Sequence, residues 1–193
     1  MGNKFMDTAL FDKAMIFAVK AHSNTERRGK GFPYIIHPME AVAIVATITS
    51  DQELLAAAAL HDVVEDTDVT IGEIESEFGP RIAGLVASES DLVIEGKSEE
   101  ETWHQRKQYA IGRLAKASRE AKIVAMGDKL SNLRAIANDY GGIGDKLWSR
   151  FHVSDPAAHE WHYRGLGQAL SELDGTAAYR EFNQLLDRIF SHK

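Results

Sequence analysis

Four consecutive alanines, Ala56–Ala59, lie within the apolar run Leu54–Leu60 and constrain this fold more than any other feature of the sequence. Alanine favours the helix and has a small side chain, so the run predicts a helix packed closely against other helices. Just before it, Ser50-Asp-Gln-Glu53 has the pattern of a capping box, which predicts where the helix starts. The polar segment His61–Asp66 follows directly. We therefore expect a central, buried helix whose far end carries polar chemistry.

Helical periodicity continues along nearly the whole chain. Further helices are expected at about 8–21, 39–49 (opened by Pro38), 71–78, 80–88, 99–116, 118–139, 156–173 and 177–190. Thr70-Ile-Gly-Glu73 and Ser98-Glu-Glu-Glu101 are predicted capping boxes, and Tyr140–Gly144 is predicted to end a helix. The sequence shows no internal repeat and no convincing strand. It predicts one all-α domain, residues 1–193, of roughly eight to ten helices.

The composition excludes several kinds of site. The 193 residues include no cysteine, which rules out disulfides, thiolate zinc sites, iron–sulfur clusters and a cysteine nucleophile. Eight histidines remain, so a metal site would have to use imidazole and carboxylate ligands. The net charge of −7 disfavours non-specific nucleic-acid binding, and no apolar run is long enough to cross a membrane. We expect a soluble cytoplasmic protein without nucleic-acid or membrane partners, and the oligomeric state stays open.

The segment after the alanine run is unusually acidic. Glu65 follows His61 by four residues, and Asp66 follows Asp62 by four. Carboxylates at the C-terminal end of a helix oppose its dipole, and near a core they need a partner. A divalent cation resolves both problems. The alternative is an acidic turn before Thr70, and a lone His-Asp pair more often only solvates a helix end.

Two further positions complete the candidate site. His37 lies at a loop-to-helix junction, where a buried histidine often serves only to cap the helix. Asp128 and Asn132 lie one turn apart on the same face of a helix that otherwise looks buried. Buried polar groups require hydrogen-bond partners. Structural pairing could satisfy them, and so could a metal for Asp128 and a substrate or water for Asn132.

Three separated motifs resemble a known family. PYIIHP at 33–38, ALHDVVEDTD at 59–68 and GDKLSNLR at 127–134 are similar to the HD superfamily of metal-dependent phosphohydrolases. They most resemble the hydrolase domain of RelA/SpoT-type alarmone enzymes, and residues 161–190 resemble the tail of the small alarmone hydrolases. The resemblance implies hydrolysis of the 3′-pyrophosphate of guanosine tetraphosphate or pentaphosphate (ppGpp or pppGpp). The products are GDP or GTP and pyrophosphate, and the usual metal is Mn(II).

The resemblance also implies roles for individual residues. The metal ligands would be His37, His61, Asp62 and Asp128. Glu65 and Asp66 match the acidic pair beside the metal, and Asn132 matches an asparagine on the helix of the last ligand. Two imidazoles and two carboxylates suit one divalent ion with open positions for water and substrate. Glu65 and Asn132 would orient and deprotonate the attacking water.

Basic residues supply the positive charge that a phosphorylated substrate needs. Arg27, Arg28 and Lys30 lie just before His37, so they can reach phosphates held at the metal. The alternative is a solvated charged loop. Arg134 could touch phosphate or bind a neighbouring carboxylate. Gly127 is expected to open space beside the metal.

Competing functions remain at this point. The same metal site could serve a phosphatase that acts on another nucleotide, such as NADPH or a nucleoside monophosphate. A nucleotide-binding sensor without turnover is a second alternative, and a purely structural helical bundle is a third.

Overall fold

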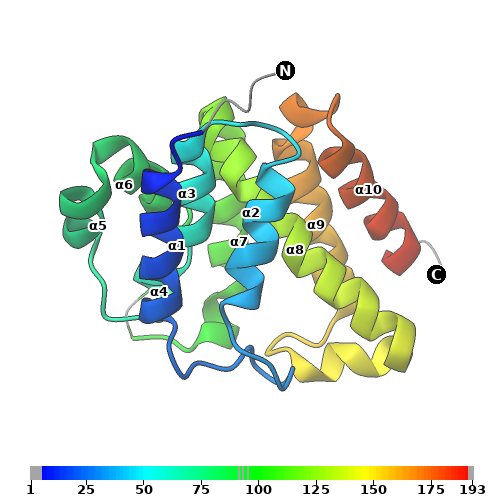
Figure 1. Ribbon diagram of the computed structural model, residues 1–193. Helices are drawn as coiled ribbons and strands as arrows, with labels where there is room; N and C mark the ends of the chain where they lie inside the picture. Colours follow the sequence, from blue (N-terminus) through cyan, green and yellow to red (C-terminus); the bar gives the residue numbers. More distant parts are fainter. Residues whose placement is uncertain (1–5, 91, 93, 95, 191–193) are drawn as a thin grey trace.

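The computed structural model describes residues 6–90, 92, 94 and 96–190, and this part of the chain is all-α, as predicted (Figure 1). The α-helices are α1 (Ala9–Ala21), α2 (Ile36–Val45), α3 (Gln52–Leu60), α4 (Val63–Asp66), α5 (Ile71–Phe78), α6 (Pro80–Ala87), α7 (Glu99–Lys116), α8 (Arg119–Ile143), α9 (Pro156–Ala169) and α10 (Ala177–Phe190). Two 3-10 helices, η1 (Gly144–Arg150) and η2 (Ser171–Leu173), complete the element order. None of the helices in the described segments is long and apolar enough to cross a membrane.

Helix α3 is the central helix that the alanine run predicts. Ala56–Ala59 are all fully buried, and α3 packs against α1, α2, α6 and α8. The predicted start was wrong by one residue. Asp51, not Ser50, is the N-cap, and its side chain accepts a hydrogen bond from the backbone N–H of Glu53. A carboxylate caps a helix as well as a hydroxyl does, so the neighbouring serine is not needed.

Other boundaries differ from the prediction, among them the end of α2, which is at Val45 and not at 49. Helix α2 begins at Ile36, so His37 lies in its first turn and not in the loop before it. Helix α8 continues through the glycines at 141 and 142 to Ile143, and its C-cap, Gly144, has a φ of +58°. Glycine weakens a helix but does not forbid it, whereas positive φ terminates it. Helix α9 ends at Ala169, and the last three residues of the predicted segment form the 3-10 helix η2.

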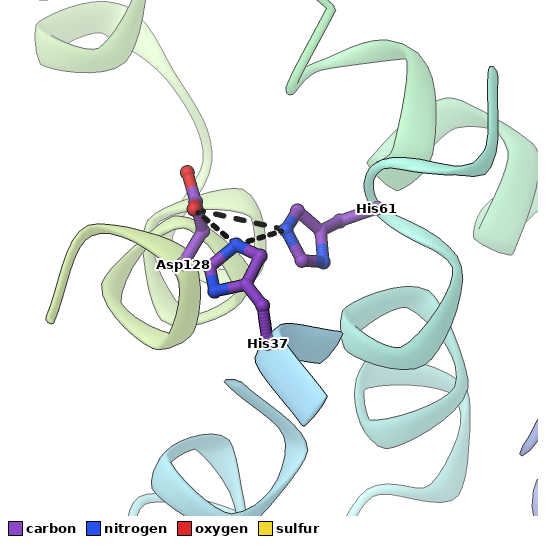
Figure 2. Close-up of side chains that lie close together, drawn as sticks. All are labelled: His37, His61 and Asp128. Carbon is purple, nitrogen blue, oxygen red and sulfur yellow. Dashed lines mark hydrogen bonds and ion pairs between the residues drawn. The ribbon is translucent and has the colours of Figure 1, made fainter. Parts of the chain in front are cut away.

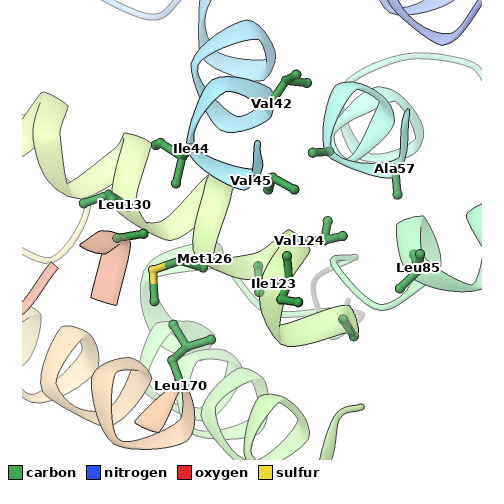
Figure 3. Close-up of a cluster of buried hydrophobic side chains, with 14 of the residues drawn as sticks. Val42, Ile44, Val45, Ala57, Leu85, Ile123, Val124, Met126, Leu130 and Leu170 are labelled. Carbon is green, nitrogen blue, oxygen red and sulfur yellow. The ribbon is translucent and has the colours of Figure 1, made fainter. Parts of the chain in front are cut away.

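The crossing of α2 over α8 organises the core (Figure 3). Gly127 lies at this crossing. A Cβ at that position would come within 2.7 Å of the Ala41 carbonyl oxygen and 2.8 Å of Val45 Cγ2. The expectation that Gly127 opens space beside the metal was therefore wrong. It allows the two helices to approach each other, and that approach brings His37 on α2 close to Asp128 on α8.

Candidate metal centre

Three side chains from three helices or helix ends converge in the interior (Figure 2). Nε2 of His37 lies 3.1 Å from Oδ1 of Asp128, and Nε2 of His61 lies 3.7 Å from the same oxygen. The two Nε2 atoms are 3.3 Å apart. All three residues are buried. Of the described histidines and acidic residues, these three form a group with the spacing of metal ligands.

Asp62 adds a second carboxylate to this group. Its Oδ2 lies 3.0 Å from Nε2 of His61 and 3.3 Å from Nε2 of His37. The hydroxyl of Tyr34 donates a hydrogen bond of 2.7 Å to the same Oδ2. Adjacent residues on a helix normally point in different directions, but α3 ends at Leu60, so His61 and Asp62 can both turn toward one point. The structure thus brings together all four predicted ligands.

The hydrogen bonds on the far side of each ring fix its protonation. Nδ1 of His61 lies 2.8 Å from the carbonyl oxygen of Ala58, which can only accept, so Nδ1 carries the proton. Nδ1 of His37 lies 2.8 Å from Oγ of Ser131, and this hydroxyl donates its own proton to Glu40. In the neutral form, both rings therefore present an Nε2 lone pair to the carboxylates.

Two lone pairs and two carboxylates that face one another require positive charge. In the metal-free protein, burial lowers the pKa of His61, but Asp62 and Asp128 outweigh burial and raise this pKa well above its usual value. Burial also raises the pKa of Asp62, yet the two histidines hold it far below its usual value. The site therefore attracts cations. Two imidazole nitrogens and two carboxylate oxygens fit a divalent ion of borderline softness.

Asp128 connects the metal centre to a chain of polar groups on α8. Its Oδ1 accepts a 2.5 Å hydrogen bond from Nδ2 of Asn132, whose Oδ1 accepts one of 2.5 Å from Arg27. Its Oδ2 is 2.5 Å from Nζ of Lys129, which also lies 3.2 Å from the carboxylate of Glu89. Asn132 thus orients both a predicted ligand and a predicted phosphate contact.

A cavity of about 430 Å³ opens onto the metal centre. Its lining includes the predicted residues Glu65 and Asp66, which are exposed beside Asp62. Many other residues of its lining are basic or aromatic. They include Trp103, Arg106, Lys107, Phe151, His152, His159, His162 and Tyr163. The sequence alone did not single out the three residues from α7, because a charged helix with scattered aromatics is usually a solvated face.

A second cavity of about 500 Å³ adjoins the first and shares Arg27, Tyr34 and Asn132 with it. Arg28 and Lys30 line this second cavity, and Nζ of Lys30 is 2.6 Å from the carboxylate of Asp139. The basic loop therefore borders the cavities, but only Arg27 reaches the one at the metal centre.

Arg134 lies elsewhere. Its guanidinium makes two hydrogen bonds of 2.7 Å to Glu181 on α10 and one of 3.1 Å to Glu40 on α2. It lines neither of the two cavities. The structure shows the second of the two readings offered for Arg134, a bond to neighbouring carboxylates, and not the contact with phosphate.

Comparisons with known proteins find relatives that match most of this chain. A protein of Danio rerio named guanosine-3′,5′-bis(diphosphate) 3′-pyrophosphohydrolase MESH1 is 34% identical over 175 residues, which cover 89% of this chain and 88% of the relative. The Homo sapiens protein of the same name is 32% identical over 185 residues, covering 94% of this chain and 93% of the relative.

A solved structure is similar over nearly the full length. It is described as a metazoan ortholog of SpoT that hydrolyzes ppGpp and plays a role in starvation responses. It covers 97% of each chain with a TM-score of 0.69 and 27% identity. Residues 14–142 match the HD domain, and this range contains all four converging side chains. The chain therefore belongs to the HD domain family.

Proposed function

We propose that this protein hydrolyses the 3′-pyrophosphate of ppGpp and pppGpp, giving GDP or GTP and pyrophosphate. The observation that carries the proposal is the convergence of His37, His61, Asp62 and Asp128 beside a cavity that His37, Asp62 and Asp128 help to line. The MESH1 relatives, whose names state this reaction, support the choice of substrate. The acidic pair and the basic residues in the same cavity lining provide the remaining groups that the reaction needs.

The four converging side chains would hold one divalent ion, and Mn(II) suits their mixture of imidazole and carboxylate. When bound, such an ion lowers the pKa of water and polarises a phosphoryl oxygen. The protein's part is to fix the ligands. The bond from His61 to the Ala58 carbonyl, and that from Tyr34 to Asp62, hold two of them in place before any ion arrives.

Glu65 and Asp66 are the proton acceptors. Both line the cavity beside Asp62, and both are exposed to it, so a water can reach their carboxylates. Glu65 would take a proton from the attacking water as its oxygen bonds to the phosphorus attached to the 3′ oxygen. The bond between that phosphorus and the 3′ oxygen then breaks, and the 3′ oxygen takes up the proton from Glu65 to become the 3′ hydroxyl. Pyrophosphate is released, and the nucleoside diphosphate or triphosphate remains.

Cations of the cavity would bind the phosphates. Arg27 borders both cavities and is held by Asn132, so its guanidinium is oriented before the substrate binds. Arg28 and Lys30 border the second cavity, where the more distant phosphates would lie. Phe151, His152 and Tyr163 line both cavities. Their rings offer faces on which a purine can stack.

Product analysis tests the proposal. Metal-stripped protein is incubated with ppGpp, with and without Mn(II), and the nucleotides are separated and quantified. We expect GDP and pyrophosphate in equal amounts, only with Mn(II). Asp62→Ala should abolish turnover by removing a ligand. Asp68→Ala is the matched control, because Asp68 belongs to the same acidic segment but is exposed and lines neither cavity.

Other outcomes distinguish the alternatives. Turnover of NADPH or of a nucleoside monophosphate in preference to ppGpp would keep the metal chemistry but overturn the substrate. Binding of ppGpp with Mn(II) and no product would indicate a sensor. Equal activity in Asp62→Ala and the unsubstituted protein would overturn the site.

A further inference from the structure

A chain of hydrogen bonds runs from the C-terminal helix to the metal centre. Nδ1 of His37 meets Oγ of Ser131 at 2.8 Å, and that hydroxyl donates a bond of 2.6 Å to Oε2 of Glu40. The other oxygen of Glu40 accepts from Arg134, which is itself held by two bonds to Glu181. Three helices, α2, α8 and α10, contribute to this chain.

The donor and the acceptor of each hydrogen bond in this network can be assigned. The Glu40 carboxylate is bonded to the Arg134 guanidinium, so it acts as an acceptor. The Ser131 hydroxyl therefore gives its single proton to Glu40, and only its lone pairs remain for His37. His37 must place its proton on Nδ1 to satisfy them. Its Nε2 is then left with the lone pair that a metal requires.

Burial protects the hydrogen bond between His37 and Ser131 from competition by water. Ser131 is 2% exposed and His37 is 4% exposed, so water cannot easily replace either partner. Without the hydroxyl, Nδ1 of His37 would lose its acceptor, and the ring could rotate or place its proton on Nε2, where it would face the metal. Either change removes a ligand.

We propose that Ser131 is a positioning residue for the metal centre: through the Ser131–Glu40 pair it fixes the orientation and tautomer of His37. This inference rests on the proposed function only in taking His37 as a metal ligand. The inference goes beyond the proposed function because it gives a role to Ser131 and Glu40, which lie outside the cavity lining. Partners of this kind typically change metal affinity or activity by about 10- to 100-fold when they are removed.

The test measures Mn(II) affinity by calorimetry on metal-stripped protein. We expect Ser131→Ala to bind Mn(II) about 10- to 100-fold more weakly than the unsubstituted protein. Ser131→Thr, which keeps the hydroxyl, should restore most of the affinity. Ser88→Ala is the matched control, because it removes a hydroxyl bond of 2.6 Å to the Leu85 carbonyl without touching His37.

A second readout separates positioning from general damage. At saturating Mn(II), Ser131→Ala should regain most of its kcat, whereas a misfolded variant would not. Glu40→Gln provides an independent variant if Ser131→Ala is poorly folded, and it should weaken Mn(II) binding in the same direction. Mn(II) binding by both variants that equals that of the unsubstituted protein would overturn the inference. If the unsubstituted protein itself bound no Mn(II), both this inference and the proposed function would fail.

Discussion

The Nε2 atoms of His37 and His61 lie 3.3 Å apart, although both rings are buried and both carry their neutral-state proton on Nδ1. Two nitrogen lone pairs at this distance repel each other unless a cation lies between them or a proton is added. The carboxylates of Asp62 and Asp128 add to the demand for positive charge.

Mn(II) should stabilise the folded protein. An ion that binds only the native state at about 100 times its Kd adds about 2.7 kcal/mol to the free energy of unfolding. For a chain of this size, that corresponds to a rise in Tm of about 5–10 °C. Differential scanning calorimetry of metal-stripped protein with and without Mn(II) measures it. Asp128→Asn should lose the rise, and an unchanged response in that variant would argue against Asp128 as a ligand.

Glu65→Gln should separate chemistry from metal binding. Glu65 lines the cavity but is not one of the four converging side chains, so Mn(II) affinity should stay unchanged. Loss of the proton acceptor should lower kcat by about 10²- to 10⁴-fold. Steady-state kinetics and calorimetry on one preparation provide both values, with Asp68→Asn as the control. Normal turnover by Glu65→Gln would show that another group accepts the proton of the attacking water.

Gly127→Ala should disturb the crossing of α2 and α8. The new Cβ would overlap the Ala41 carbonyl oxygen, which is backbone and cannot move by a simple rotation. Overpacking of this kind lowers the free energy of unfolding by about 1–3 kcal/mol. Because the crossing aligns His37 with Asp128, Mn(II) affinity should fall as well.

Gly142→Ala is the matched control for that substitution. It lies on the same helix, with open space around the position of the added Cβ. Replacing a helical glycine by alanine there should raise the free energy of unfolding by about 0.5–1 kcal/mol. Denaturant unfolding of both variants tests the pair. If Gly127→Ala raised the free energy of unfolding as Gly142→Ala does, the close approach of α2 and α8 would not exclude a larger side chain at residue 127.

His162 should make the protein sensitive to acid. Burial lowers its pKa to about 3, and the nearby lysines at 107 and 129 act in the same direction. In the unfolded chain a histidine titrates near pH 6.5, so below that pH the unfolded state binds a proton that the folded state does not. His162 therefore lowers the free energy of unfolding as the pH falls from about 6.5 toward 3, by at most about 1.4 kcal/mol per pH unit.

Urea unfolding at a series of pH values checks this effect. His162→Gln should show a shallower loss of stability on acidification than the unsubstituted protein. His104→Gln is the control, because His104 is exposed and stacks on Trp161 at 4.2 Å. Parallel pH curves for His162→Gln and the unsubstituted protein would contradict the prediction.

Local patterns in the sequence were enough to predict most of the helices, whereas the set of four converging side chains came from the resemblance to the HD superfamily. The capping boxes at Thr70 and Ser98 are present, and α10 has the predicted bounds. His61 and Asp62 could be singled out because an acidic helix end after an apolar run is physically unusual. Each of these predictions depends on residues that are close together in the sequence.

The partners of those side chains could not be predicted in the same way. Ser131 reaches His37 across 94 residues of sequence, and Arg134 reaches Glu181 across 47. Such pairs depend on how α2, α8 and α10 pack, which no local pattern specifies. The same limit explains why Arg134 was a candidate for phosphate binding and why Gly127 was placed beside the metal and not at a helix crossing.

Anomalous diffraction from crystals grown with Mn(II) locates the ion itself. We predict one strong peak in the anomalous difference map, bounded by Nε2 of His37, Nε2 of His61 and the carboxylates of Asp62 and Asp128. The same map from Asp62→Ala crystals should show that peak greatly reduced. A map without a peak among these four side chains, or with its peak elsewhere in the cavity, would show that they are not the metal ligands.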